Sequence, residues 1–106
     1  MAKYLYKVSY SLDGLKGIMR QGAAARAEQI RQIVAGNGGT VESFHFAFGE
    51  TDAYVTVDLP GDTAAAALSL AVASSGAATI ETVKLLTPAE VDEARGIQTG
   101  YVPPGP

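Results

Sequence analysis

Two segments in the middle of the chain alternate between apolar and polar side chains, as β-strands with one buried face do. They cover residues 40–48 and 52–59, with a short turn at Gly49 and Glu50 between them. The pattern therefore predicts a β-hairpin. Its apolar face would hold alternate residues of both strands: Phe44, Phe46, Phe48, Ala53, Val55, Val57 and Leu59. Its other face would hold the polar side chains His45, Asp52, Tyr54, Thr56 and Asp58.

A strand pattern and a helix pattern precede the hairpin. Residues 4–9 have the aromatic and β-branched side chains of a strand. Apolar residues at helical spacing then predict a helix that begins at Ser11 or Asp13 and runs to Val34. Its first turns contain three glycines, Gly14, Gly17 and Gly22. Because a glycine costs up to about 1 kcal/mol relative to alanine inside a helix, we expect this stretch to be looped or kinked before Ala23, which makes it a candidate for a mobile lid.

A second helix and a fourth strand follow the hairpin. The Ala-rich residues 64–74 predict a helix, which Asp62 or Thr63 would cap. Residues 79–86 are rich in Ile, Val and Thr and predict a strand. The sequence Thr87-Pro88-Ala89-Glu90 has the residue types of a capping box with proline at the first helical position. A short last helix is predicted to follow from there.

The predicted order of elements is β-α-β-β-α-β with a short C-terminal helix, which is the ferredoxin-like arrangement of an α+β domain. We expect a four-stranded antiparallel sheet with both main helices on one face. Its own chain would leave the other face uncovered, and a second copy is the simplest cover, which predicts a homodimer or higher homo-oligomer. Residues 1–95 would form this single domain, and residues 96–106 a tail rich in glycine and proline.

Composition narrows the classes of function. A chain of 106 residues with 47% hydrophobic content predicts one folded domain. The formal charge of −3 offers no basic stripe for nucleic acid, and we expect neither a membrane span nor an export signal. Cysteine is absent and there is one histidine, so no metal site and no cofactor are expected. The absence of cysteine also fits a cytoplasmic protein.

His45 is the first candidate for chemistry, because imidazole is the side chain that gains and loses a proton near neutral pH. If it faces a cavity, it would act as a general acid or base, with Asp52 orienting the ring and Tyr54 binding a substrate oxygen. The alternative, favoured for a single histidine, is a hydrogen bond within a dimer interface. Asp52 also has an alternative role, since an aspartate after a tight turn commonly accepts backbone N–H bonds.

A row of tyrosines marks one side of the first predicted strand, at positions 4, 6 and 10. Such a row would line a pocket for an aromatic ligand, with Tyr6 and Tyr10 as binding residues, although core packing is the commoner reason for the pattern. Lys84 in the fourth strand would hold an anionic oxygen if it points into a cavity, or pair with a nearby acid. The arginines of the first helix, Arg20, Arg26 and Arg31, are interpreted as a solvated surface.

Four stretches of the sequence carry a family resemblance. They are Lys3-Tyr4-Leu5-Tyr6-Lys7-Val8-Ser9-Tyr10, Ile33-Val34-Ala35-Gly36-Asn37-Gly38-Gly39, Phe48-Gly49-Glu50-Thr51-Asp52 and Leu86-Thr87-Pro88-Ala89-Glu90. Across residues 3 to about 92 the chain resembles the GYD-domain family. Where that family carries Gly-x-Tyr-Asp, this chain has Thr51 in place of the tyrosine. The resemblance implies a dimeric α+β barrel, a scaffold whose related families include cofactor-free oxygenases, isomerases, decarboxylases and ligand-sensing domains.

Three functions are compatible with these patterns. The one that asks least of the sequence is a small homo-oligomeric protein that binds a small organic molecule in a pocket between sheet and helices. The second is a cofactor-independent enzyme resembling a monooxygenase, isomerase or decarboxylase, with His45 as acid or base and Tyr54 or Lys84 stabilising an enolate. The third is a structural assembly module in which the C-terminal tail bridges subunits.

Overall fold

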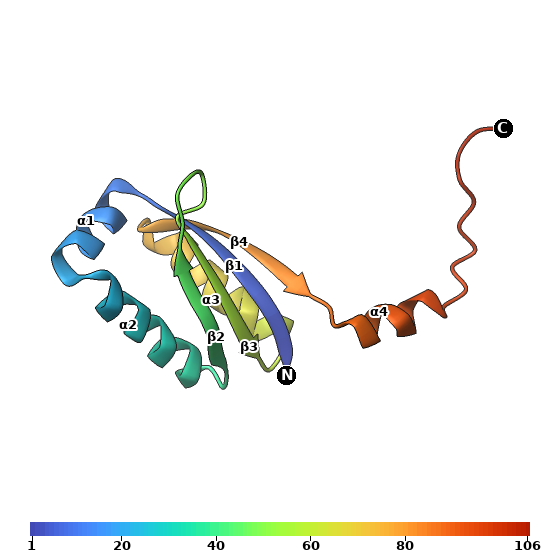
Figure 1. Cartoon of the computed structure of the whole chain (residues 1–106), viewed down its shortest axis with the longest axis horizontal. Coiled ribbons are helices and arrows are strands. Elements are labelled where there is room, and N and C mark those ends of the chain that lie inside the picture. The colour runs from blue at the N-terminus through green and yellow to red at the C-terminus, as the bar shows by residue number, and fades with distance from the viewer.

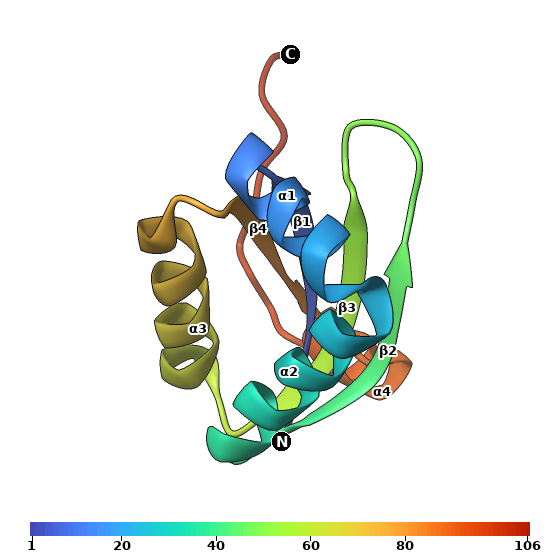
Figure 2. The same ribbon diagram turned by 90° about the vertical axis from the view of Figure 1, so that its left-hand side faces the viewer.

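The computed structural model describes all 106 residues and contains an antiparallel sheet with helices packed on one face (Figures 1 and 2). Its strands are β1 (Ala2–Tyr10), β2 (Thr40–Phe46), β3 (Ala53–Leu59) and β4 (Ala78–Leu85), in the order β2-β3-β1-β4. Its helices are α1 (Leu12–Gln21), α2 (Ala23–Gly36), α3 (Asp62–Ser75) and α4 (Pro88–Arg95). The predicted ferredoxin-like α+β fold is confirmed, with the first predicted helix divided into two.

The core lies between the sheet and helices α2 and α3. It is built from alternate residues of the two central strands: Tyr4, Tyr6 and Val8 from β1, and Ala53, Val55, Val57 and Leu59 from β3. The antiparallel register sets Tyr6 opposite Val55, so both rows face the helices. Val34 of α2, Ala65 of α3 and Ala78 of β4 complete the buried apolar set. The apolar face predicted for residues 53–59 is therefore confirmed.

Gly22 divides the predicted first helix into α1 and α2. Its φ of 94° lies in the region that glycine adopts without the steric clash of a Cβ atom. The Gly22 N–H donates to the Ile18 carbonyl at 2.7 Å and closes α1, while the Gly22 carbonyl accepts from the Arg26 N–H at 3.2 Å in the first turn of α2. The predicted kink before Ala23 is confirmed.

Helix α1 is anchored to the connection between α3 and β4. The N–H and the hydroxyl of Ser11 both donate to the Ala77 carbonyl, at 2.9 and 3.1 Å. The Ser11 hydroxyl also caps α1 by accepting from the Gly14 N–H at 3.2 Å. A Cβ atom on Gly14 would lie 2.1 Å from the Ala77 oxygen. Glycine at this position therefore permits the close approach of the helix.

The hairpin has a longer connection than the sequence pattern predicts, because residues 47–52 form a loop between β2 and β3. Phe48 is fully exposed in this loop, so its predicted place in the apolar row is wrong. The reason is that the backbone of Asp52 bonds to β1 on one side and to Ala47 on the other. Its N–H donates to the Val8 carbonyl at 2.9 Å and its carbonyl accepts from the Ala47 N–H at 2.8 Å. These bonds close the loop at Ala47 and Asp52, so Phe48 lies inside the loop and is not paired with β3.

The C-terminal arm, defined as residues 86–106, extends away from the sheet on the side opposite α2 and α3 (Figures 1 and 2). Helix α4 has the predicted capping box between Thr87 and Glu90, and all its residues are exposed. The arm gives the chain a radius of gyration of 17.0 Å, against about 13 Å for a compact chain of this length. None of the four helices combines the length and apolar character that a membrane-spanning segment requires.

Candidate functional site

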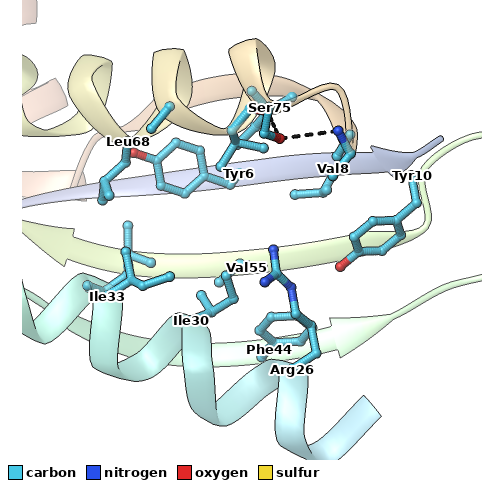
Figure 3. Close-up of a pocket in the computed structure, with 17 residues that line it drawn as sticks. Tyr6, Val8, Tyr10, Arg26, Ile30, Ile33, Phe44, Val55, Leu68 and Ser75 are labelled. Atoms are coloured by element: carbon cyan, nitrogen blue, oxygen red, sulfur yellow. Dashed lines mark hydrogen bonds between the residues drawn. The ribbon is translucent and has the colours of Figure 1, made fainter. Parts of the chain in front are cut away.

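A cavity of about 250 Å³ lies between the sheet and helices α2 and α3 (Figure 3). Of its 17 lining residues, 15 are hydrophobic, and the other two are Arg26 and Ser75. The Ser75 hydroxyl is already engaged, since it donates to the Val72 carbonyl at 2.6 Å. An apolar cavity with very few polar groups is the usual form of a site for a small organic molecule.

The placement of the two helices creates this cavity. Helix α2 packs over β2, and α3 packs over β4, which are the two edge strands. The space between the helices therefore lies over the central strands β1 and β3 (Figure 2). The walls come from both layers: Tyr6, Val8, Phe44, Val55 and Ile80 from the sheet, and Ile30, Ile33, Leu68, Ala71 and Val72 from the helices. The short side chains on α3, such as Ala71, leave the volume unfilled.

Tyr6 contributes its ring to the cavity wall and its hydroxyl to the fold. The hydroxyl donates to the carbonyl of Ala65 at 2.8 Å, which ties β1 to α3. Burial raises the pKa of Tyr6 to about 12, so this phenol is neutral at physiological pH. The predicted binding residue Tyr6 therefore lines the cavity with an apolar surface.

Tyr10 and Arg26 form the polar end of the cavity. Figure 3 shows the Tyr10 hydroxyl and the Arg26 guanidinium at the same end, both directed into the space between α2 and the sheet. Burial raises the pKa of Tyr10, and the neighbouring positive charge of Arg26 opposes part of that rise. Arg26 is half-buried and donates to the Gln29 side chain at 3.3 Å. It forms no ion pair with any carboxylate of the chain.

A second cavity, of about 160 Å³, adjoins the first beneath α1. Three residues line both cavities and so mark the boundary between them: Tyr10, Arg26 and Ala77. The second cavity is more polar, since its walls include Asp13, Gln21 and glycines of α1. The two cavities thus place an apolar compartment and a polar compartment on either side of Tyr10 and Arg26.

Lys84, the third predicted ligand residue, does not line either cavity. Its ammonium group lies 2.9 Å from the Asp62 carboxylate, which also accepts from the Tyr4 hydroxyl at 2.5 Å. These hydrogen bonds, that of Tyr4 first, lower the pKa of Asp62, and Asp62 in turn raises the pKa of Lys84. The prediction that Asp62 or Thr63 caps α3 is wrong, because Gly61 holds the cap position and the Asp62 side chain turns to Tyr4 and Lys84.

The three predicted catalytic residues lie apart from the cavities. His45 and Tyr54 are directly opposed on neighbouring strands, on the sheet face that no helix covers. Asp52 does not hydrogen-bond to His45. Its carboxylate accepts from the Tyr10 N–H at 2.9 Å, the backbone role that was its alternative. Because strand residues alternate between faces, the sheet separates His45 and Tyr54 from Tyr6 and Tyr10. No group of three or more acidic or histidine side chains is placed to hold a metal ion.

The sequence interpretation missed Arg26, which it assigned with two other arginines to a solvated surface. The structure places Arg26 half-buried at the cavity instead. A signal was present in the spacing, because Arg26 precedes Ile30 and Val34 by four and eight positions. Residues at these intervals share one face of a helix. A basic residue within an apolar stripe is therefore the pattern that would have identified it.

A sequence model of one protein family matches most of the chain. The family is described as GYD domain, and the match covers residues 4–94 of 106. It confirms the resemblance that the four sequence stretches carry, and it spans the elements from β1 into α4. No curated protein and no solved structure gives a match to this chain.

Proposed function

The chain belongs to the GYD domain family, and we propose that it binds a small organic molecule in the cavity between the sheet and helices α2 and α3. The observation that carries this proposal is an apolar space of about 250 Å³ between the sheet and the helices, in which Arg26 is the one charged lining residue. An apolar cavity of about 150 Å³ in another protein is large enough for benzene. The space here suits a ligand with one or two fused rings.

The expected driving force is burial of the apolar body of the ligand. A ligand the size of an indole ring buries roughly 200 Å² of surface. At about 25 cal/mol per Å², this burial contributes about 5 kcal/mol before the cost of immobilising the ligand. We therefore expect weak but specific binding of simple ring compounds, detectable by protein NMR.

The test is a titration with indole, followed through the amide signals of the protein. We expect shifts at residues of the cavity wall, such as Val55 and Ile30, and no shifts at His45. The variant Ala71→Phe places a ring in the cavity and should abolish these shifts. Ala73→Phe is the matched control, since Ala73 is exposed on the same helix and lines neither cavity. Equal binding by the two variants would contradict the proposal.

The enzyme alternative has less support from the geometry. His45 is exposed on the open face, and Asp52 bonds to Tyr10 instead of orienting the imidazole. Lys84 faces the helix side of the sheet, opposite Tyr4 in the register, so one subunit does not bring it together with His45. Catalysis by His45 would require a second subunit to enclose it. We retain this reading as the alternative to binding in the cavity.

We also propose that a second copy of the chain covers the open face of the sheet. Leu5, Val83 and Leu85 lie on this face without a covering helix. The C-terminal arm extends on the same side and exposes its own apolar side chains: Leu86, Val91, Ile97, Tyr101 and Val102. In a two-fold dimer, the C-terminal arm of each copy would cover the open sheet face of the other copy. This arrangement also includes the assembly role expected of the tail.

Mass measurement by light scattering tests the proposed association. The monomer mass is 10.9 kDa, and we expect about twice this value or more for the full chain. Val83→Asp on the open face should return the monomer, whereas Thr82→Asp, on the same strand but the opposite face, should leave the mass unchanged. Removal of residues 96–106 should weaken association if the tail bridges subunits. A monomeric full chain at all concentrations would contradict the proposal.

A further inference from the structure

We propose that the ligand of the cavity is a small carboxylic acid, bound as a monoanion, with its ring or alkyl body in the apolar cavity and its carboxylate on Arg26. This inference rests on the proposed function and adds the chemical class of the ligand. Two observations support it: Arg26 is the only basic residue that lines either cavity, and it lies at the boundary between them.

Arg26 is the only charged residue in the wall of the large cavity. Of the eight basic residues of the chain, five take part in ion pairs: Lys3, Lys7, Arg31, Lys84 and Arg95. The other three are Lys16, Arg20 and Arg26, and the first two are exposed on α1. Arg26 is thus the one partly buried cation that lacks an anionic partner. Burial of an unpaired cation costs free energy, and an anionic group on the ligand would offset that cost.

The geometry of the groups favours a carboxylate. A guanidinium presents its N–H donors in a planar fork that matches the two oxygens of a carboxylate. One donor of Arg26 meets Gln29 at 3.3 Å and another is shared with the Tyr10 hydroxyl, which leaves others of the five for the ligand. The Tyr10 hydroxyl at the same end of the cavity is neutral because burial raises its pKa, so it is available as a further donor.

The second cavity limits the charge of the ligand. No basic residue except Arg26 lines either cavity, so a dianion such as a phosphate monoester would keep one charge without a partner. Asp13 lines the second cavity together with Arg26 and adds a charge that repels a second negative charge on the ligand. One carboxylate satisfies Arg26 and also lies at the boundary of the polar compartment, whose wall includes Gln21. The site therefore selects monoanions with an apolar body.

The decisive comparison uses two probes of equal shape, 2-naphthoate and its neutral counterpart 2-naphthamide, titrated into the full chain at neutral pH. We expect the carboxylate to bind at least about tenfold more tightly, as charge-assisted hydrogen bonds require. Raising the ionic strength from about 0.05 to about 0.5 M should weaken the naphthoate and leave the naphthamide unchanged. Equal affinities of the two probes for the unmodified protein would overturn the inference.

Variants then assign the preference to Arg26. Arg26→Gln should bring the two affinities within about twofold of each other by reducing naphthoate binding, while naphthamide still binds. Arg20→Gln is the matched control, since it removes the same charge from an exposed position of α1. It should leave the preference intact. A preference that survives Arg26→Gln, or is lost equally in Arg20→Gln, would also overturn the inference.

The two proposals fail in distinguishable ways. If neither naphthalene probe nor indole shifts any cavity residue, the binding function itself is wrong. If all of them shift Val55 and Ile30 with no preference for the anion, the binding function holds and the ligand class is wrong. Arg26→Lys keeps the charge and loses the planar fork, so it should retain part of the preference. This variant distinguishes the loss of the planar fork from a general effect of removing a positive charge from α2.

Discussion

The two faces of the sheet use the same strands for different chemistry. On the covered face, tyrosine hydroxyls are tied to α3, as Tyr4 is to Asp62 and Tyr6 to Ala65, and one arginine stays unpaired beside a cavity. On the open face, polar side chains pair with each other across strands, as Lys7 does with Glu81 at 3.4 Å. Exposed pairs of this kind contribute little stability each. The comparison assigns the proposed ligand binding to the covered face and the proposed self-association to the open face.

The largest expected effect is a difference between leucines on the two faces. Leu59 is fully buried on the covered face, so Leu59→Ala should lower the free energy of unfolding by about 3 kcal/mol. Leu85→Ala on the open face should cost about 1 kcal/mol or less in the monomer, because Leu85 is only half-buried. Urea unfolding at low protein concentration measures both. Similar losses under these conditions would contradict the distinction between the faces.

The second prediction concerns two glycines of α1 on the covered side. Gly14→Ala should destabilise the protein by about 2 kcal/mol, because the new Cβ would lie 2.1 Å from the Ala77 oxygen. Gly17→Ala is the matched control. Its nearest neighbour is the Arg20 side chain at 3.9 Å, so alanine should stabilise the helix by roughly 0.5–1 kcal/mol. Changes in the free energy of unfolding that have opposite signs for the two variants would support the close approach of α1. Changes of the same sign would argue against it.

The smallest expected effect is a pH dependence at the edge of the covered face. Hydrogen bonds from Tyr4 and Lys84 lower the pKa of Asp62 below its ordinary value of 3.8. The contribution of Asp62 is therefore fully present above that ordinary value and is lost as the pH falls through the lower pKa of the folded state. Asp62→Asn should remove it, so the stability difference from the unmodified protein should shrink in acid.

Unfolding curves between neutral pH and about pH 3 measure this difference. Asp92→Asn is the control, because Asp92 is exposed on α4 and pairs only with Arg95 at 3.0 Å within the same helix. It should leave the unfolding free energy nearly unchanged. A stability difference for Asp62→Asn that grows as the pH falls would have the wrong sign for a carboxylate held in its charged form.

Features set by near neighbours in the chain were predictable from the sequence. The capping box of α4 depends on Thr87 and Glu90, three residues apart, and the break at Gly22 depends on one backbone conformation. Features set by distant residues were not. Phe48 lies outside the apolar row because Asp52 bonds to Val8 of another strand. Asp62 does not cap α3 because its carboxylate accepts hydrogen bonds from Tyr4 and Lys84.

Local patterns in the sequence were sufficient to predict the order of elements, the apolar and polar faces of residues 53–59 and the family of the fold. Strand and helix periods are local, and burial of one face per element leaves few arrangements. The positions of α2 and α3 over the edge strands depend on packing across the whole chain, and so does the position of the cavity over β1 and β3. That placement turned Arg26 from a surface residue into the one unpaired cation of an apolar site, because packing between distant segments sets which volume stays unfilled.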